Sequence, residues 1–180
     1  MLFTYAECLE KCKSDYEIKK ALKNKELYKL SKGLYSDKEY VSGNAVVMKK
    51  YPEAVFTLNS AFFYHGLTDT IPSKYYLQTD KDAAKISDSN VKQIFDNYDS
   101  MQVGRDCIEY NGEKIRIFNK ERLLIELIRN KSKLPFDYYK EILGNYRRII
   151  YDLDFELIEK YSEKLPKTKM VMNVIQSEVF

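Results

Sequence analysis

The sequence predicts an α+β protein of two parts: an N-terminal winged helix-turn-helix, and a mixed α/β C-terminal domain that ends in a helical cluster. Three observations support this class. Between Ser14 and Ser36, a short lysine-rich helical pattern is followed at once by a tight hairpin pattern. Strand-like segments lie in the middle of the chain, and amphipathic helical patterns fill its end. Strands and helices in separate blocks are typical of α+β proteins.

Two short helices are expected at the N-terminus. Thr4 can cap a helix that runs through Cys12, and Glu7, three residues further on, completes a capping box. After a turn at residues 13–14, Ser14 or Asp15 can cap a second helix to about residue 24. Apolar residues recur at helical spacing in both segments, so each helix should bury one face.

A β-hairpin should follow the second helix. Residues 27–30 alternate as a strand, Ser31-Lys32-Gly33 supplies the turn, and Leu34-Tyr35 forms the returning strand. Such a small unit buries little surface by itself, so it should lean on the chain that follows. We expect a winged helix at residues 1–38 and an α+β domain at residues 39–180, with a connecting helix at about 38–50.

The C-terminal part should begin with strands and end with helices. Strands are expected at residues 55–57 and 74–79, and a hairpin at 108–117 turned by Asn111-Gly112. Asn59 or Ser60 should cap the aromatic helix AFFYH, which Gly66 ends. Further helices are expected at 119–131, at 135–143 closed by Gly144, at 154–165 and from 167 onward. The aspartate-rich residues between 80 and 106 have the composition of a solvated loop.

Positive charge is concentrated in the predicted winged helix. The whole chain carries a net charge of +3, but residues 11–32 hold eight lysines against three acidic residues, a local charge of +5. A basic helix face beside a basic wing is typical of proteins that bind nucleic acid. A solvated face of an amphipathic helix is the alternative interpretation. The candidate DNA-binding residues are Lys13, Ser14, Tyr16, Lys19, Lys20, Lys23, Lys29 and Lys32.

The sequence gives little support to an enzyme, a cofactor site or a metal site. Three cysteines leave one unpaired in any disulfide scheme, which favours a reducing compartment, and we expect a cytoplasmic protein without a membrane partner. Cys8 and Cys12 share a helix face, but only His65 could extend them to a metal site. His65 itself is expected to cap a helix end or fill a polar notch. The aspartates from Asp80 to Asp106 match no phosphoryl-transfer motif.

A second cationic group lies near the C-terminus. Arg122 and Arg129 are seven residues apart, hence on one face of their helix, and Arg147-Arg148 follow after a short gap. We expect these four arginines to form surface ion pairs with nearby glutamates. A surface that contacts a protein or RNA partner is the alternative.

Four segments, in a consistent order, carry a resemblance to a known family. They are KGLYS (residues 32–36), SAFFYHGLTDTIP (60–72), KYYLQT (74–79) and NGEKIRIFNKERLLIELIR (111–129). Together they resemble the AbiEi-type antitoxins of bacterial abortive-infection systems, over roughly residues 4–165. The resemblance implies a type IV antitoxin whose winged helix represses its own operon at promoter repeats, and whose C-terminal domain counters a nucleotidyltransferase toxin.

The resemblance implies operator contacts by five of the lysines: Lys19, Lys20, Lys23, Lys29 and Lys32. It also implies that residues 60–66 and 121–129 serve chiefly packing. Two other classes of function stay open. One is a stand-alone winged-helix regulator whose C-terminal domain senses a ligand or oligomerises, and the other is a nucleic-acid enzyme that uses the aspartates.

Overall fold

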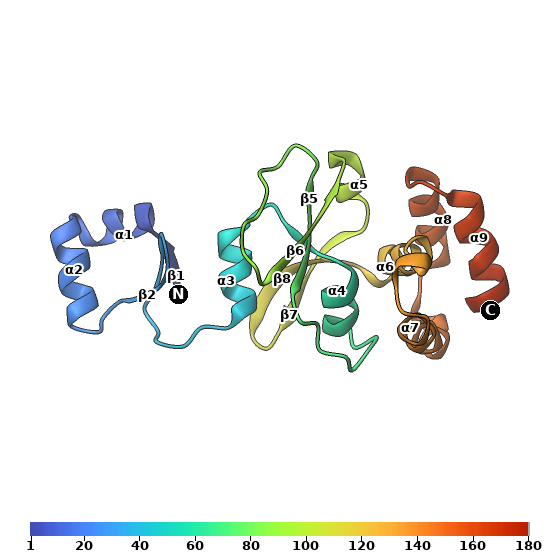
Figure 1. Ribbon diagram of the computed structural model, residues 1–180, viewed down its shortest axis with the longest axis horizontal. Coiled ribbons are helices and arrows are strands. Elements are labelled where there is room, and N and C mark those ends of the chain that lie inside the picture. The colour runs from blue at the N-terminus through green and yellow to red at the C-terminus, as the bar shows by residue number, and fades with distance from the viewer. Residues whose placement is uncertain (180) are drawn as a thin grey trace. The chain divides into compact units, whose positions relative to one another are not determined.

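The computed structural model describes residues 1–179, and its chain divides into two compact units, Met1–Pro52 and Glu53–Phe180. Figure 1 shows both units and their elements. Across residues 1–179, no helix is both long enough and apolar enough to cross a lipid bilayer.

The first unit has the connectivity of a winged helix-turn-helix. Its elements are β1 (Leu2–Thr4), α1 (Tyr5–Cys12), α2 (Asp15–Lys23), β2 (Tyr28–Ser31), β3 (Leu34–Ser36) and α3 (Gly43–Lys50). The three strands form an antiparallel sheet in the order β1-β3-β2, so the hairpin is completed by a strand that precedes both helices. The predicted fold class is thereby confirmed. Strand β1 was not predicted, because three residues are too few to show alternation.

Helix α3 belongs to the first unit. Ser42 caps it by accepting a hydrogen bond from the amide of Ala45. The Lys49 Nζ atom of α3 donates to Glu7 Oε1 of α1 over 2.7 Å, and α3 also contacts β1. The compact unit therefore extends to Pro52, fourteen residues beyond the boundary expected at residue 38.

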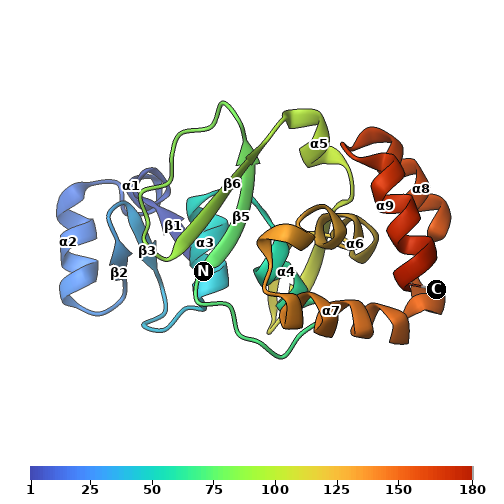
Figure 2. The same cartoon turned by 45° about the vertical axis from the view of Figure 1, so that its right-hand side comes forward.

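The second unit is a five-stranded mixed sheet followed by a cluster of helices. Its elements are β4 (Val55–Phe56), α4 (Leu58–Tyr64), β5 (Tyr75–Asp80), β6 (Val91–Asp96), α5 (Tyr98–Gln102), β7 (Arg105–Tyr110), β8 (Glu113–Phe118), α6 (Lys120–Arg129), the 3₁₀ turns η1 (Lys131–Lys133) and η2 (Ile150–Asp152), α7 (Phe136–Arg148), α8 (Phe155–Lys164), α9 (Thr168–Val174) and the π-helical η3 (Ile175–Val179). The strand order is β6-β5-β4-β8-β7. Figure 2 shows α7, α8 and α9 grouped at the C-terminal end of this unit.

Turn and cap chemistry account for several of these elements. Asn111 and Gly112 both have positive φ, at 52° and 79°, as a two-residue turn between β7 and β8 requires. Asn119 caps α6 and Asp154 caps α8 through their side chains. Fully buried residues of α6, among them Leu123 and Leu127, form part of the core.

Three predictions for the second unit were wrong. Residues 91–96 and 98–102 form β6 and α5 rather than a solvated loop, because β6 pairs in parallel with β5 along its whole length. Gly144 does not end a helix, since α7 continues through it to Arg148. Neither Asn59 nor Ser60 is the N-cap of α4, a position held by Thr57. The Ser60 hydroxyl instead donates to the carbonyl of Lys74, just before β5, and accepts from the amide of Tyr76 in β5.

Candidate nucleic-acid interface

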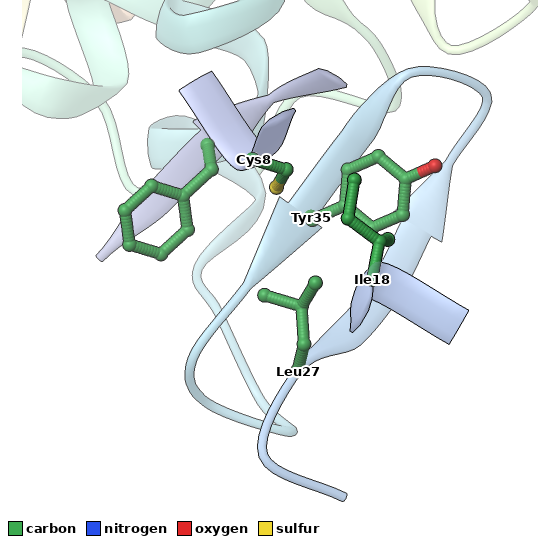
Figure 3. Close-up of a cluster of buried hydrophobic side chains, with 5 residues drawn as sticks. Cys8, Ile18, Leu27 and Tyr35 are labelled. Carbon is green, nitrogen blue, oxygen red and sulfur yellow. The ribbon is translucent and has the colours of Figure 1, made fainter. Parts of the chain in front are cut away.

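A small apolar core holds the helix-turn-helix and the hairpin together. Phe3, Cys8, Ile18, Leu27 and Tyr35 are buried in one cluster, with exposed fractions of 8% or less. Figure 3 shows four of these side chains converging from α1, α2, the start of the hairpin and β3. Because β1, both helices and the hairpin region contribute to this small cluster, a few buried side chains fix the position of α2 relative to the hairpin.

The turn between α1 and α2 is fixed by backbone and side-chain contacts. Lys13 adopts the left-handed conformation, with a φ of 66°, and its amide donates to the Leu9 carbonyl. The Ser14 hydroxyl then caps α2 by accepting from the amide of Glu17 at 3.3 Å. Between the helices, the Tyr5 hydroxyl donates to Asp15 Oδ1 over 2.5 Å, and this bond raises the pKa of Tyr5. These contacts set the direction in which α2 leaves the turn.

Helix α2 presents a basic stripe on the face opposite its buried residue, Ile18. We define the basic stripe as Tyr16, Lys19, Lys20 and Lys23, which stand at positions i, i+3, i+4 and i+7 and are all exposed. Residues at this spacing share one face of a helix. Tyr16 is 72% exposed, so its ring lies at the surface beside the three lysines. The stripe therefore combines three positive charges with one exposed aromatic ring, as a surface suited to a polyanion does.

Neutralisation within the basic stripe is slight. Glu17 lies 3.7 Å from Lys20, and both side chains are about half exposed, so solvent screens this pair. Lys19 and Lys23 form no ion pair with any residue of the described chain, 1–179. The first unit as a whole holds eleven lysines against seven acidic residues, whereas the second holds nineteen basic against twenty acidic residues.

The wing is the β2–β3 hairpin. Lys32 and Gly33 form its turn, and Gly33 has the positive φ, 75°, that glycine adopts at low cost. The Gly33 carbonyl accepts a hydrogen bond from the amide of Tyr5, which ties the turn to the start of α1. Lys29 and Lys32 are exposed on this hairpin, at a strand and at the turn respectively. All eight candidate residues thus belong to the second helix, the turn before it or the wing.

The four arginines considered for a partner surface, Arg122, Arg129, Arg147 and Arg148, do not all lie on the surface. Arg122 is fully buried, because its side chain packs between α6 and the connection from α5 to β7. Its Nε donates to Glu126 Oε1 at 3.0 Å, and its Nη1 donates to the carbonyls of Ser100 and Val103 at 2.8 and 3.3 Å. Burial lowers the pKa of Arg122, and the charge of Glu126 opposes this shift. The prediction that Arg122 belongs to a partner surface is therefore wrong.

The other three arginines are engaged within the unit. Arg129 Nη1 donates to Glu126 Oε1 at 2.7 Å, so that Glu126 bridges two guanidinium groups. Arg147 Nε donates to the Glu178 carbonyl at 2.7 Å, and Arg148 Nη1 donates to Asn145 Oδ1 at 3.1 Å. Two of the arginines thus pair with a glutamate, Glu126, although this pairing is buried rather than on the surface, and Arg147 and Arg148 bond neutral groups instead.

Several of the residues considered for catalysis and metal binding have partners within the fold. His65 follows α4 at its C-cap and places Nε2 2.8 Å from the Phe118 carbonyl oxygen, as expected for a polar notch, and burial lowers its pKa. Cys8 is buried in the apolar core and Cys107 is exposed. Asp80 and Asp88 accept backbone hydrogen bonds in turns. Within residues 1–179, no three His, Cys, Asp or Glu side chains are grouped to hold a metal ion.

The fold and the basic stripe define a two-unit protein with an N-terminal winged helix-turn-helix. A search by sequence against protein-family models and curated proteins gave no match. By structure, the chain is similar to a crystal structure of the RV2827C protein from Mycobacterium tuberculosis, with a TM-score of 0.68 and 11% sequence identity. The match covers 99% of this chain and 72% of that one. At this identity, the similarity establishes a shared fold.

Proposed function

We propose that the first unit binds duplex DNA and that the protein represses its own promoter. The observation that carries the proposal is the basic stripe, Tyr16, Lys19, Lys20 and Lys23, on the exposed face of the second helix of a winged helix-turn-helix. In this class of fold the second helix enters the major groove, while cations beside it neutralise phosphates. Lys29 and Lys32 of the wing would lie over the adjacent backbone.

Within the basic stripe, the two ends have different tasks. Tyr16 lies in the first turn of α2, the part of a recognition helix that reaches base edges. Lys19, Lys20 and Lys23 follow on the same face and would hold phosphates, so they supply affinity rather than sequence discrimination. The three lysines are exposed, and only Lys20 lies near an acidic side chain, so their charge is free to meet phosphates.

We further propose that the protein is a type IV antitoxin that counters a nucleotidyltransferase toxin. The support is the resemblance of four ordered segments to AbiEi-type antitoxins, together with a two-unit fold of the expected class. The second unit, which carries three of those segments, would hold the protective activity. A stand-alone regulator whose second unit senses a ligand is the alternative, and the presence of a neighbouring nucleotidyltransferase gene separates the two.

Promoter binding by charge-matched variants tests the first proposal. In a fluorescence anisotropy assay on the upstream DNA, the triple variant K19Q/K20Q/K23Q should bind about 100-fold more weakly than the parent. The control K81Q/K85Q/K92Q removes the same charge from exposed lysines of the second unit and should bind like the parent. Equal affinities for both variants would contradict the assignment of the interface to α2.

Growth rescue by the separated second unit tests the antitoxin proposal. Residues 53–180 have their own sheet and core, and should restore growth to cells that make the toxin without repressing the promoter. The cut falls after Pro52 because a cut at residue 38 would remove the Glu7–Lys49 contact of the first unit. A folded fragment that fails to rescue growth would count against a protective role for this unit alone.

A further inference from the structure

A cleft of about 610 Å³ lies in the second unit between the α5–β7 connection and α8. Its lining includes Val103 and Gly104 from the connection, Arg105 from the start of β7, and Tyr161 and Lys164 from α8. Pockets for small molecules span roughly 300–1,000 Å³. The cleft therefore has room for a small organic ligand.

Two cations line this cleft without partners. Arg105 is half-buried and Lys164 is exposed, and neither forms a hydrogen bond or an ion pair through its side chain with another residue in the range 1–179. Asp99 adds a carboxylate, which leaves the lining with a net charge of +1. Positive charge is reinforced nearby, since Arg105 is one of the causes that lower the pKa of Arg116, after burial.

The wall of the cleft is held rigidly from beneath. The buried Arg122 donates to the carbonyls of Ser100 and Val103, and the amide of Asn119 donates to the Gly104 carbonyl at 2.8 Å. Gly104 has a φ of 71°, and a Cβ there would lie 2.5 Å from Arg122 Cβ. These bonds and this close packing hold the connection in place, and a preorganised wall lowers the cost of binding.

Tyr161 adds a mixed polar and apolar surface. Its hydroxyl oxygen accepts a hydrogen bond from Asn119 Nδ2 at 3.2 Å, and its own proton is donated to no residue of the described chain. That proton is thus available to a ligand, and the half-buried ring offers a face for stacking.

We propose that this cleft binds a small organic phosphate of nucleotide size. Arg105 and Lys164 would bind the phosphate, because an arginine fork and a lysine point charge from two elements suit a tetrahedral oxyanion. Tyr161 would contact the organic part. The site lies wholly in the second unit, so it is independent of the DNA interface on α2.

An NMR titration of the full chain with AMP, adenosine and inorganic phosphate tests the proposal. AMP should cause saturable shifts of the amides of Val103, Gly104, Arg105 and Tyr161, with an affinity at least about tenfold above that of either other probe. Equal affinity for AMP and adenosine, equal affinity for AMP and inorganic phosphate, or no shift at these amides with about 10 mM AMP would each overturn the assignment.

Variants locate the phosphate contact. R105Q and K164Q should each weaken AMP binding by about tenfold or more. K160Q removes an exposed lysine from the same helix outside the cleft lining and should bind AMP like the parent. If K160Q weakens AMP binding as much as K164Q does, the effect is one of general charge and the site assignment fails. The shifts of the unsubstituted chain still decide the question if R105Q does not fold.

Discussion

Helix α2 of the first unit and helix α6 of the second use cationic residues in opposite ways. In the first unit, lysines of α2 stand exposed and largely unpaired around a core of only a few side chains. In the second, Arg122 of α6 is fully buried and holds Glu126 and two backbone carbonyls. Spacing along a helix identifies a shared face, but only the tertiary structure shows whether that face meets solvent or the core. Charge is available for binding on α2 and is consumed by folding at Arg122 of α6.

The largest loss of stability is expected when the buried Arg122 is replaced. The substitution R122M should destabilise the second unit by about 4 kcal/mol, because it breaks the buried ion pair with Glu126 and leaves the carbonyls of Ser100 and Val103 without this donor. Urea unfolding of residues 53–180 measures the change. The control R148M removes an exposed arginine bonded only to a neighbouring amide, and it should cost no more than about 0.5 kcal/mol. A small loss of stability in R122M would show that the Arg122 guanidinium does not stabilise the fold.

The next effect is expected in the core of the first unit. The substitution I18A removes a 3% exposed side chain from the central cluster and should cost about 3 kcal/mol. A unit of this size has little stability to spare, so most of it should unfold and DNA binding should be lost. NMR spectra of the full chain should show collapsed signals for residues 1–52 and native signals for the rest. Cooperative loss of both units would contradict their separate stability.

The smallest effect is an acid dependence confined to the first unit. Hydrogen bonding to Lys49 and to the Thr4 amide lowers the pKa of Glu7 to about 2, from an ordinary value of 4.5. Because the folded-state pKa is depressed, the ionised carboxylate stabilises the unit above about pH 4.5, and that stability is lost as the pH falls toward 2. Thermal melts between about pH 5 and pH 3 should show a smaller decline for E7Q than for the parent. An equal decline in E7Q and in the parent would show that Glu7 is not the source of the acid dependence.

Sequence alone predicted most of the local structure. Helix caps and turns depend on only three or four neighbouring residues. The sequence therefore identified the Thr4–Glu7 capping box, the Ser14 cap and the Asn111-Gly112 turn. The exposed face of α2 followed from the spacing of Ile18 and its lysines. The division of function between binding DNA and countering a toxin stays a prediction.

What the sequence could not show depends on distant partners. Strand β6 exists because β5 pairs with it, and its residues VKQIFD alternate poorly by themselves. Gly144 sits inside α7 because the packing of Leu143 and Tyr146 outweighs its weak helix propensity. The cleft beside α8 joins residues about sixty positions apart in the chain. The feature of the sequence that came nearest to marking the cleft is Gly104. A lone glycine of this kind can mark a turn, a bulge or a helix end, so it does not identify a cleft.

The salt dependence of promoter binding tests the central claim most directly. Each lysine on a phosphate contributes about 0.9 to the slope of log affinity against log salt concentration. The parent should therefore show a steep slope, and K19Q/K20Q/K23Q should reduce its magnitude by about three. An unchanged slope in the triple variant would contradict the claim that the basic stripe of α2 is the surface that holds DNA.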